Sequence, residues 1–250
     1  MITKPPIGAT LNRSHPLARG LVGAWLFNEG GGTVAHDASG RGNHGTLTNM
    51  DPATDWTPRG LDFDGSDDYV SCGGAVVTSP PLTLVARIMF PVGVSNYVAL
   101  SIAKTNNVVR LYYNNSNGWT AQYYTGGSDG GASVVDASLV GRYITLVGVF
   151  PAANLRHLYI DGALRATNTD ACGAMTGTAT QVGAMNWSGV PQYWTGEIDF
   201  AYIFSRALPA NEVAAISSNP YAMFERRRTL YVPAGTTTGT PYYYHRRFAA

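Results

Sequence analysis

The sharpest chemical candidate in this sequence is the triplet Glu197-Ile198-Asp199, in which two carboxylates stand two residues apart. Positions i and i+2 of a β-strand share one face of a sheet, so both carboxyl groups would point the same way. Retaining hydrolysis of a glycosidic bond needs two carboxyls about 5–5.5 Å apart, one of them a proton donor. Tyr202 lies further along the same run, but a tyrosine with a pKa near 10 is a poor proton donor at neutral pH. We therefore expect a structural strand with a polar pair, and no catalysis.

A cation site is the second candidate. The segment HDASGRGNHG (36–45) places Asp37 and Asn43 in a tight glycine-rich loop, and calcium prefers oxygen ligands of these types. The alternative is an Asx-turn, in which Asp37 accepts hydrogen bonds from backbone amides and holds no ion. His36 and His44 flank the same turn, but two histidines alone do not make a zinc site, so we expect surface positions for them. The sequence contains no motif of serine hydrolases, zinc proteases, P-loops or dinucleotide-binding folds.

Aromatic side chains next to amides could bind a sugar, because a sugar site combines stacking faces with a few polar groups. The segments NNSNGWTAQYY (114–124) and MNWSGVPQYW (185–194) carry such sets, and the candidates are Trp119, Tyr123, Trp187, Tyr193 and Trp194. Some of the five should belong to the core, because alternate strand positions point inward. Contact with another protein is an equal alternative, since Trp and Tyr are enriched at interface hot spots.

The elements that would position these residues are mostly short β-strands. Apolar runs alternate with polar residues, are rich in Val, Ile, Tyr, Phe and Thr, and are bounded by Gly, Asn, Asp and Pro. This pattern predicts an all-β, antiparallel two-sheet sandwich. The clearest runs are 21–27, 60–65, 68–72, 82–90, 108–114, 119–125, 142–150, 155–161, 163–168, 180–185 and 197–204.

Three local signals complete the expected fold. Asp161-Gly162 predicts a tight hairpin turn, because glycine accepts a positive φ at little cost. Pro209 and the segment NEVAAI (211–216) predict one short helix that ends near Asn219. The two cysteines, Cys72 and Cys172, are too few for a secreted disulfide framework; we expect small reduced side chains, with one disulfide as the alternative.

Composition and charge limit the classes of partner. The 250 residues carry 13% charged side chains and a net charge of +1, which gives no global attraction to nucleic acid or to anionic membranes. No apolar stretch is long enough to span a bilayer, and residues 1–20 lack the apolar region of a secretory signal. Residues 1–19 predict an extended N-terminal arm, and 221–250 predict a basic, Tyr-rich C-terminal arm around a domain at 20–220. Assembly contacts are expected from Arg226, Arg227, Arg228, Tyr242, Tyr243, Tyr244 and Phe248.

Several segments in order resemble the laminin G-like, concanavalin A-like lectin and glucanase superfamily. They are GLVGAWLFNEGGGTVAHDASGRGNHGTL (20–47), GLDFDGSDDYV (60–70), RYITLVGVFPAANLRHLYIDGALRAT (142–167) and GEIDFAYIFSRALPANEVAAI (196–216). The resemblance covers about 20–220 and implies a jelly roll of two curved sheets, whose concave face often binds carbohydrate. It also implies a structural calcium near the start and close of the fold, which adds Asp199 to Asp37 and Asn43. Glucanases of this fold carry E-x-D-x-x-E or E-x-D-x-E on one strand, and this chain lacks the last Glu.

The flanking segments NRSHPLARGLVGAWLFNEG (12–30) and SNPYAMFERRR (218–228) resemble jelly-roll proteins encoded among tailed-bacteriophage structural genes. The sequence thus predicts a non-catalytic virion surface protein, a capsid decoration or a fibre or adhesin component, made in the host cytoplasm. Its expected partners are other virion proteins, copies of itself and surface glycans, and neither nucleic acid nor membrane. The alternatives are a bacterial carbohydrate-binding module and, as the weakest, a glycoside hydrolase. Structural calcium is the one cofactor expected.

Overall fold

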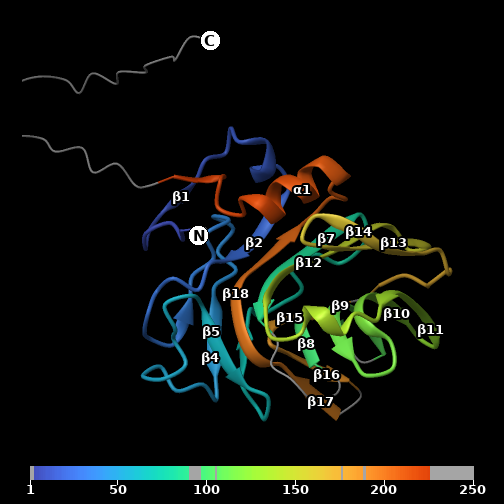
Figure 1. Cartoon of the computed structure of the whole chain (residues 1–250), viewed down its shortest axis with the longest axis horizontal. Helices are drawn as coiled ribbons and strands as arrows, with labels where there is room; N and C mark the ends of the chain where they lie inside the picture. Colours follow the sequence, from blue (N-terminus) through green and yellow to red (C-terminus); the bar gives the residue numbers. More distant parts are fainter. Residues whose placement is uncertain (1–2, 90–96, 105, 176, 188–189, 226–250) are drawn as a thin grey trace, which may run out of the picture.

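The computed structural model of this chain describes residues 3–89, 97–104, 106–175, 177–187 and 190–225, and two antiparallel β-sheets dominate it (Figure 1). The larger sheet has eight strands in the order β11-β10-β9-β8-β15-β6-β4-β3. Their bounds are β11 (Ser128–Val134), β10 (Gly118–Thr125), β9 (Asn107–Asn114), β8 (Tyr97–Lys104), β15 (Ala179–Val182), β6 (Tyr69–Ser71), β4 (Gly45–Thr48) and β3 (Val34–Ala35).

The second sheet has seven strands, and β18 runs through it as a long curved strand (Figure 1). Six strands follow the order β14-β13-β12-β7-β18-β2, and β5 pairs with the first half of β18. The bounds are β14 (Ala163–Asn168), β13 (Leu155–Ile160), β12 (Tyr143–Ala152), β7 (Leu82–Met89), β18 (Thr195–Phe204), β2 (Leu21–Trp25) and β5 (Leu61–Asp64). The all-β, two-sheet jelly-roll class predicted from the sequence is therefore confirmed.

The main core lies between the two sheets. Inward-facing residues from both, such as Ile88 and Leu146 on one side and Leu111 and Trp119 on the other, form one buried cluster. Because side chains alternate along a strand, every second residue faces away from this core. Two smaller clusters cover those outer faces.

The outer face of the eight-stranded sheet is partly covered by a two-stranded hairpin, β16 (Ala184–Trp187) and β17 (Val190–Tyr193). The hairpin follows β15 directly, although the sequence predicts one strand over 180–185. Gly183 breaks that strand: its φ is +79°, and a Cβ there would lie 2.3 Å from the Phe63 ring. The ordinary strand pattern hides this turn, because only glycine fits so close to an aromatic ring.

The outer face of the seven-stranded sheet is covered by the helix α1 (Ala210–Ser218) and by both ends of the described chain. Val213 and Ile216 of α1 pack on this face with Leu17 from the N-terminal side and Met223 from the C-terminal side. The described residues contain this one α-helix and two short 3-10 turns, Pro16–Ala18 and Ala137–Leu139. The helix was predicted from Pro209, which lies at its N-cap.

The N-terminal segment is part of the folded domain, which corrects the expectation of a separate arm over 1–19. Leu17 is 3% exposed, and β1 (Thr10–Leu11) pairs antiparallel with β19 (Phe224–Glu225). The predicted boundary at 220/221 is also too early, because Tyr221 and Phe224 are buried. Apolar side chains at these positions reach a surface of their own domain, so no second subunit is needed to order them.

Two further local predictions are confirmed. Asp161 and Gly162 both have positive φ, 50° and 84°, and join β13 to β14 as a two-residue hairpin turn. Cys72 and Cys172 are free, Cys72 being buried and Cys172 half-buried. The strands missed in the sequence include β4 and β8, whose alternation of small and apolar residues is weak.

Candidate functional site

Glu197 and Asp199 lie on the outer face of the seven-stranded sheet, because Ile198 between them points into the main core. Glu197 is 9% exposed, and each oxygen of its carboxylate accepts a short hydrogen bond, one from the hydroxyl of Thr57 and one from the hydroxyl of Tyr143. Burial and the neighbouring Glu197 raise the pKa of Tyr143 well above its usual range. Both oxygens of the Glu197 carboxylate are therefore hydrogen-bonded to side chains of the same domain.

Asp199 occupies a β-bulge, where β18 shifts register against β7 between Ile198 and Phe200. Its carboxylate lies 3.0 Å from Lys4 Nζ and 3.1 Å from Arg87 Nε, and it accepts a hydrogen bond of 2.8 Å from the Tyr221 hydroxyl. Burial lowers the pKa of Lys4 although Asp199 opposes that effect, and burial raises the pKa of Tyr221. These contacts tie the two ends of the domain to the sheet, which is a structural arrangement.

The predicted calcium ligands do not form a shared cation site. Asp37 accepts four hydrogen bonds: Oδ1 from the amides of Ala24 and Ser39, and Oδ2 from the Ser39 hydroxyl and the amide of Asn43. The Asn43 side-chain amide donates to the carbonyl of Val22. A cation at Asp37 would face N–H groups of the same polarity, and Asp199 already holds two cationic side chains. The geometry is the Asx-turn alternative, so these residues do not fit calcium.

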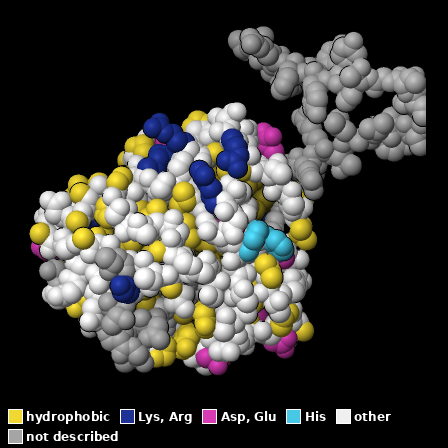
Figure 2. Space-filling model, turned by 180° about the vertical axis from the view of Figure 1, so that it is seen from behind, with side chains coloured by type: hydrophobic (Ala, Val, Ile, Leu, Met, Phe, Trp, Pro, Cys, Tyr) yellow, Lys and Arg dark blue, Asp and Glu magenta, His cyan; other side chains and the backbone are white. Residues whose placement is uncertain are grey.

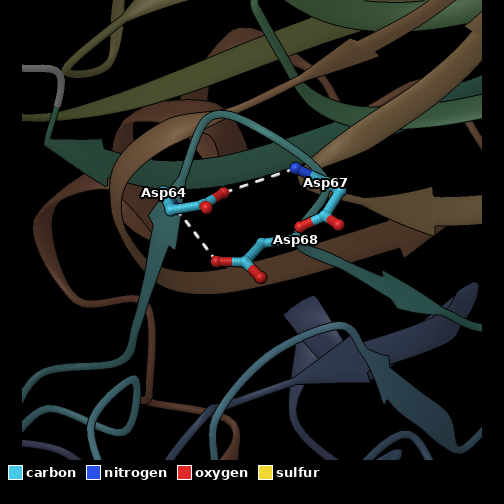
Figure 3. A group of neighbouring side chains, drawn as sticks. All are labelled: Asp64, Asp67 and Asp68. Carbon is cyan, nitrogen blue, oxygen red and sulfur yellow. Dashed lines mark hydrogen bonds between the residues drawn. The ribbon is translucent and has the colours of Figure 1, made fainter.

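Three other carboxylates do meet, in the turn between β5 and β6. Single oxygens of Asp64, Asp67 and Asp68 lie within 4.8 Å of one another (Figure 3). Asp64 accepts hydrogen bonds from the amides of Ser66 and Asp67 and donates its own amide to Asp68. Burial opposes ionisation of Asp64, but these amides outweigh it and lower its pKa, whereas burial and the neighbouring acids raise the pKa of Asp68. Backbone donors thus organise this turn.

Three of the five predicted sugar-binding aromatics belong to the core. Trp119 and Trp194 are fully buried and Tyr123 is 1% exposed, so none of them offers a ring face to a sugar. The sequence argument selected the wrong parity on β10, where Trp119 and Tyr123 point inward while Thr120 and Gln122 point outward. Tyr193 is half-buried with its ring centroid 6.4 Å from that of Tyr69. The side chain of Trp187 lies outside the described part of the structure.

A polar cavity of about 230 Å³ lies on the outer face of the eight-stranded sheet, where sequence reasoning placed no site. Its lining is entirely polar or glycine: Tyr112, Asn117, Gly131, Ser133, Asn168 and Asp170. The residues come from β9, the β9–β10 turn, β11 and the end of β14. The absent side chain of Gly131 keeps the floor low, because a Cβ there would touch the Thr120 methyl group at 3.0 Å. The signal available in the sequence was the alternation along β11, where Gly131 and Ser133 face the cavity while Ala132 between them faces the core.

The wall of this polar cavity is fixed by Arg156, which is fully buried. Its guanidinium donates to the side-chain oxygen of Asn168, to the carbonyl of Asp170 at 2.5 Å and to the carbonyl of Ala153 at 3.1 Å. Among the described residues no carboxylate lies within ion-pair distance of Arg156. Backbone and side-chain amide oxygens therefore stabilise its buried positive charge. The Asn168 amide in turn donates to the Asp170 carboxylate at 2.7 Å. Both cavity residues are therefore held in place.

The predicted assembly residues lie outside the described residues: Arg226, Arg227, Arg228, Tyr242, Tyr243, Tyr244 and Phe248. Their roles stay predictions. His36 is on the surface as predicted, its side chain 67% exposed. In the part of the chain that the structure describes, no helix combines the length and apolar character needed to cross a membrane.

The fold and these surface features define a lectin-like jelly-roll sandwich. A family model described as the concanavalin A-like lectin/glucanases superfamily matches residues 64–214, and the chain belongs to this family. No curated protein matches the sequence at a significant level.

Solved structures share the fold at low sequence identity. Domain 4 of AbnA, a GH43 extracellular arabinanase from Geobacillus stearothermophilus solved with arabinotriose, is 16% identical with a TM-score of 0.60, covering 79% of this chain and 98% of that domain. A Trypanosoma rangeli sialidase, solved with a difluorinated keto-deoxy sugar acid, is 18% identical with a TM-score of 0.60. That match covers 87% of this chain but 36% of the sialidase. At such identities the likeness establishes the fold alone.

Proposed function

We propose that this protein is a non-catalytic, glycan-binding jelly-roll module displayed on a bacteriophage particle. The observation that carries the binding role is the polar cavity over Gly131. A sugar ring presents several hydroxyls, each both donor and acceptor, and the cavity offers an acid, two amides and two hydroxyls within one small space. Its volume lies below the roughly 300–1,000 Å³ of pockets for drug-sized ligands, which suits a single sugar residue.

The arrangement of acids supports binding without hydrolysis. A glycosidase needs two carboxyls flanking the bond, and Asp170 is the one acid among the residues that line the polar cavity. Glu197 and Asp199 lie on the other sheet. Thr57 and Tyr143 donate hydrogen bonds to Glu197, and Asp199 is contacted by Lys4, Arg87 and Tyr221. The likeness to an arabinanase domain in complex with arabinotriose favours a neutral glycan, and the negative charge of Asp170 favours one too.

The virion role rests on other features. Segments 12–30 and 218–228 resemble jelly-roll proteins of tailed phages, and residues 225–250 carry five of the fifteen arginines and one acid. We assign the contacts with other virion proteins to the segment that follows Glu225, because the residues described up to that point form a closed domain. Mass spectrometry of purified particles of the encoding phage should detect the chain at a fixed stoichiometry. Its absence from particles would leave a bacterial carbohydrate-binding module.

A glycan array with the full-length chain tests the binding role. We expect binding of a restricted set of neutral glycans, and Asp170→Asn should weaken it at least tenfold by removing a charged acceptor. Asp67→Asn, which removes an exposed acid from a turn on another part of the domain, is the matched control and should bind normally. Retained binding in Asp170→Asn would place the glycan elsewhere. Release of reducing ends from a bound glycan, lost in Glu197→Gln, would contradict the non-catalytic role.

A further inference from the structure

A second cavity, of about 360 Å³, opens between the N-terminal segment and the loop after β2. Ile7, Gly8 and Ala9 form one side, and the other side includes Leu26, Glu29 and the histidines His36 and His44. The two imidazole rings meet edge to face with centroids 5.5 Å apart. Figure 2 shows histidine side chains gathered on the surface beside apolar ones. We call this space the Glu29 cavity.

The Glu29 cavity combines apolar walls with an incompletely paired carboxylate. Glu29 Oε1 accepts the amide of His36 at 2.7 Å and lies 3.3 Å from His36 Nδ1, while Oε2 is buried and has no hydrogen-bond partner among the described residues. A buried carboxylate oxygen without a donor is costly, so a cation that reaches it is strongly favoured. Leu26, Ala9 and Ala38 offer contact to an alkyl stem. This chemistry fits a cationic group on an aliphatic chain.

The histidines do not turn this cavity into a metal site. His44 Nδ1 accepts the amide of Asp37 at 3.1 Å, so its proton is on Nε2, and that nitrogen has no lone pair for a metal. Moreover, Glu29, His36 and His44 are not a group whose ligand atoms lie within 4.8 Å of one another, in contrast to Asp64, Asp67 and Asp68. An organic cation with an alkyl stem is the better occupant, and a guanidinium adds several donors in one plane.

The covalent path of the chain brings such a group to the cavity. In the β1–β19 pair, Glu225 lies opposite Thr10, and Ala9, the next residue along the N-terminal strand, lines the cavity. The ladder ends there, because the Ala9 amide donates to Pro6 and closes a turn through Ile7 and Gly8. The three residues after Glu225 are all arginine. An extended tripeptide spans about 10 Å, so each of the three starts within reach of the cavity mouth.

We propose that the segment Arg226–Arg228 docks into the Glu29 cavity of its own chain, with one guanidinium paired to Glu29. The pairing supplies the missing donor to Oε2, and the arginine stem covers the apolar wall, as long cationic side chains do. The root of the C-terminal segment is then fixed on the domain, and residues 229–250 remain for contact with other proteins. This inference does not depend on glycan binding.

Limited trypsin digestion of the full-length protein tests the docking, because trypsin cleaves after arginine. We expect cleavage at Arg226–Arg228 to be roughly tenfold faster in Glu29→Gln than in the native chain, since a hydrogen bond to a charged group is lost. Asp67→Asn removes the same charge elsewhere and should leave the rate unchanged. High salt should accelerate cleavage of the native chain and not of Glu29→Gln. Equal rates in the native chain and Glu29→Gln would overturn the proposal.

A second measurement covers the case in which Glu29→Gln disturbs the domain. The triple variant Arg226→Gln, Arg227→Gln, Arg228→Gln changes no residue of the described domain, so its fold should be intact. Hydrogen exchange at the amides of residues 7–9 and 36–44 should be faster in this variant than in the native chain, because the cavity is left open. Unchanged exchange would contradict docking. Protection that increases with protein concentration would place the arginines in the cavity of a second copy and would equally overturn the intramolecular proposal.

Discussion

Lys4 and Asp199 form an ion pair of 3.0 Å across 195 positions of the chain, and only 14% and 13% of the two side chains are exposed. Lys4 Nζ also donates to the carbonyls of Leu26, Phe27 and Asp199, so the lysine is held by four oxygens. The pair fastens the start of the domain to the bulge of β18. A buried pair of this kind is costly to break from one side, because the remaining charge is left without its partner.

Lys4→Met should therefore lower the free energy of unfolding by about 3 kcal/mol, with a fall in melting temperature of roughly 6–12 °C. Asp67→Asn, which removes an exposed charge, should change stability by less than about 0.5 kcal/mol. Deletion of residues 1–19 should be more damaging than Lys4→Met, because Leu17 and β1 are lost with the lysine. A truncated domain as stable as the full chain would restore the separate arm expected from the sequence. Thermal denaturation of the three variants decides.

Alkaline pH should weaken the same face of the domain. Burial is the first cause that raises the pKa of Tyr202 and Tyr221, and also that of Tyr143, above the ordinary value of about 10. A raised pKa in the folded state means that the unfolded chain loses these protons first, so the stability present below pH 10 is lost as the pH rises further. The pKa of Lys4 is lowered, so this lysine makes the free energy of unfolding rise with pH below pH 10.5. The three tyrosines together should outweigh this single lysine.

Urea denaturation between pH 9 and pH 11.5 measures this effect. We expect the free energy of unfolding to fall increasingly steeply above pH 10. Tyr221→Phe should be less stable at pH 8, because the hydrogen bond to Asp199 is lost, but should show a shallower decline. A native chain whose stability is flat to pH 11.5 would mean that these hydroxyls ionise as readily in the fold as in water.

Much of the fold could be predicted from the sequence, because period-two alternation reports burial directly. β12, β13 and β18 are apolar on the inner face, and the Asp161-Gly162 turn follows from backbone sterics. The outer faces were harder to predict. Phe200 and Tyr202 alternate with Ile198 and Ala201 in a strand that is apolar on both sides, and nothing local indicates that α1 and residues 3–19 cover the second side.

The candidate site was harder to predict than the fold, for a physical reason. Large aromatic side chains beside amides suggest a sugar platform, but Trp119 and Tyr123 contribute most to stability when they are buried, and they are buried here. The residues of the polar cavity come from segments that meet only after folding. Arg156, whose burial no local pattern indicates, holds Asn168 and Asp170 at the wall of the cavity that Asn117 and Ser133 also line.

Substitutions at two adjacent glycines of β11 should have different effects, one on stability and the other on glycan binding. Gly130 faces the core side, where an added Cβ would lie 1.7 Å from Arg156 Nη2, while Gly131 faces the polar cavity. Because Arg156 is locked by its hydrogen bonds and cannot move aside, Gly130→Ala should cost about 3 kcal/mol or more. Gly131→Ala should remain folded, because its Cβ meets only the Thr120 methyl and the Ser133 hydroxyl. In glycan titrations it should bind more weakly, since the new methyl raises the floor. The reverse pattern would contradict the assigned faces.

Arg156 is the positioning residue for the polar cavity, and Arg156→Lys tests that role. Lysine keeps the charge but offers one nitrogen in place of the planar fork that holds Asn168, Asp170 and Ala153 together. We expect a loss of about 2 kcal/mol in stability, because a buried acceptor is left without its donor. If Arg156 had only a structural role, the glycan affinity of the folded protein would be unchanged in Arg156→Lys.

A positioning role predicts in addition that glycan affinity is weakened about tenfold at temperatures well below melting. It also predicts that Asp170→Asn adds little further loss when combined with Arg156→Lys, because the two changes affect one contact set. Full additivity of the two variants in calorimetric titration would show that Arg156 does not act through Asp170.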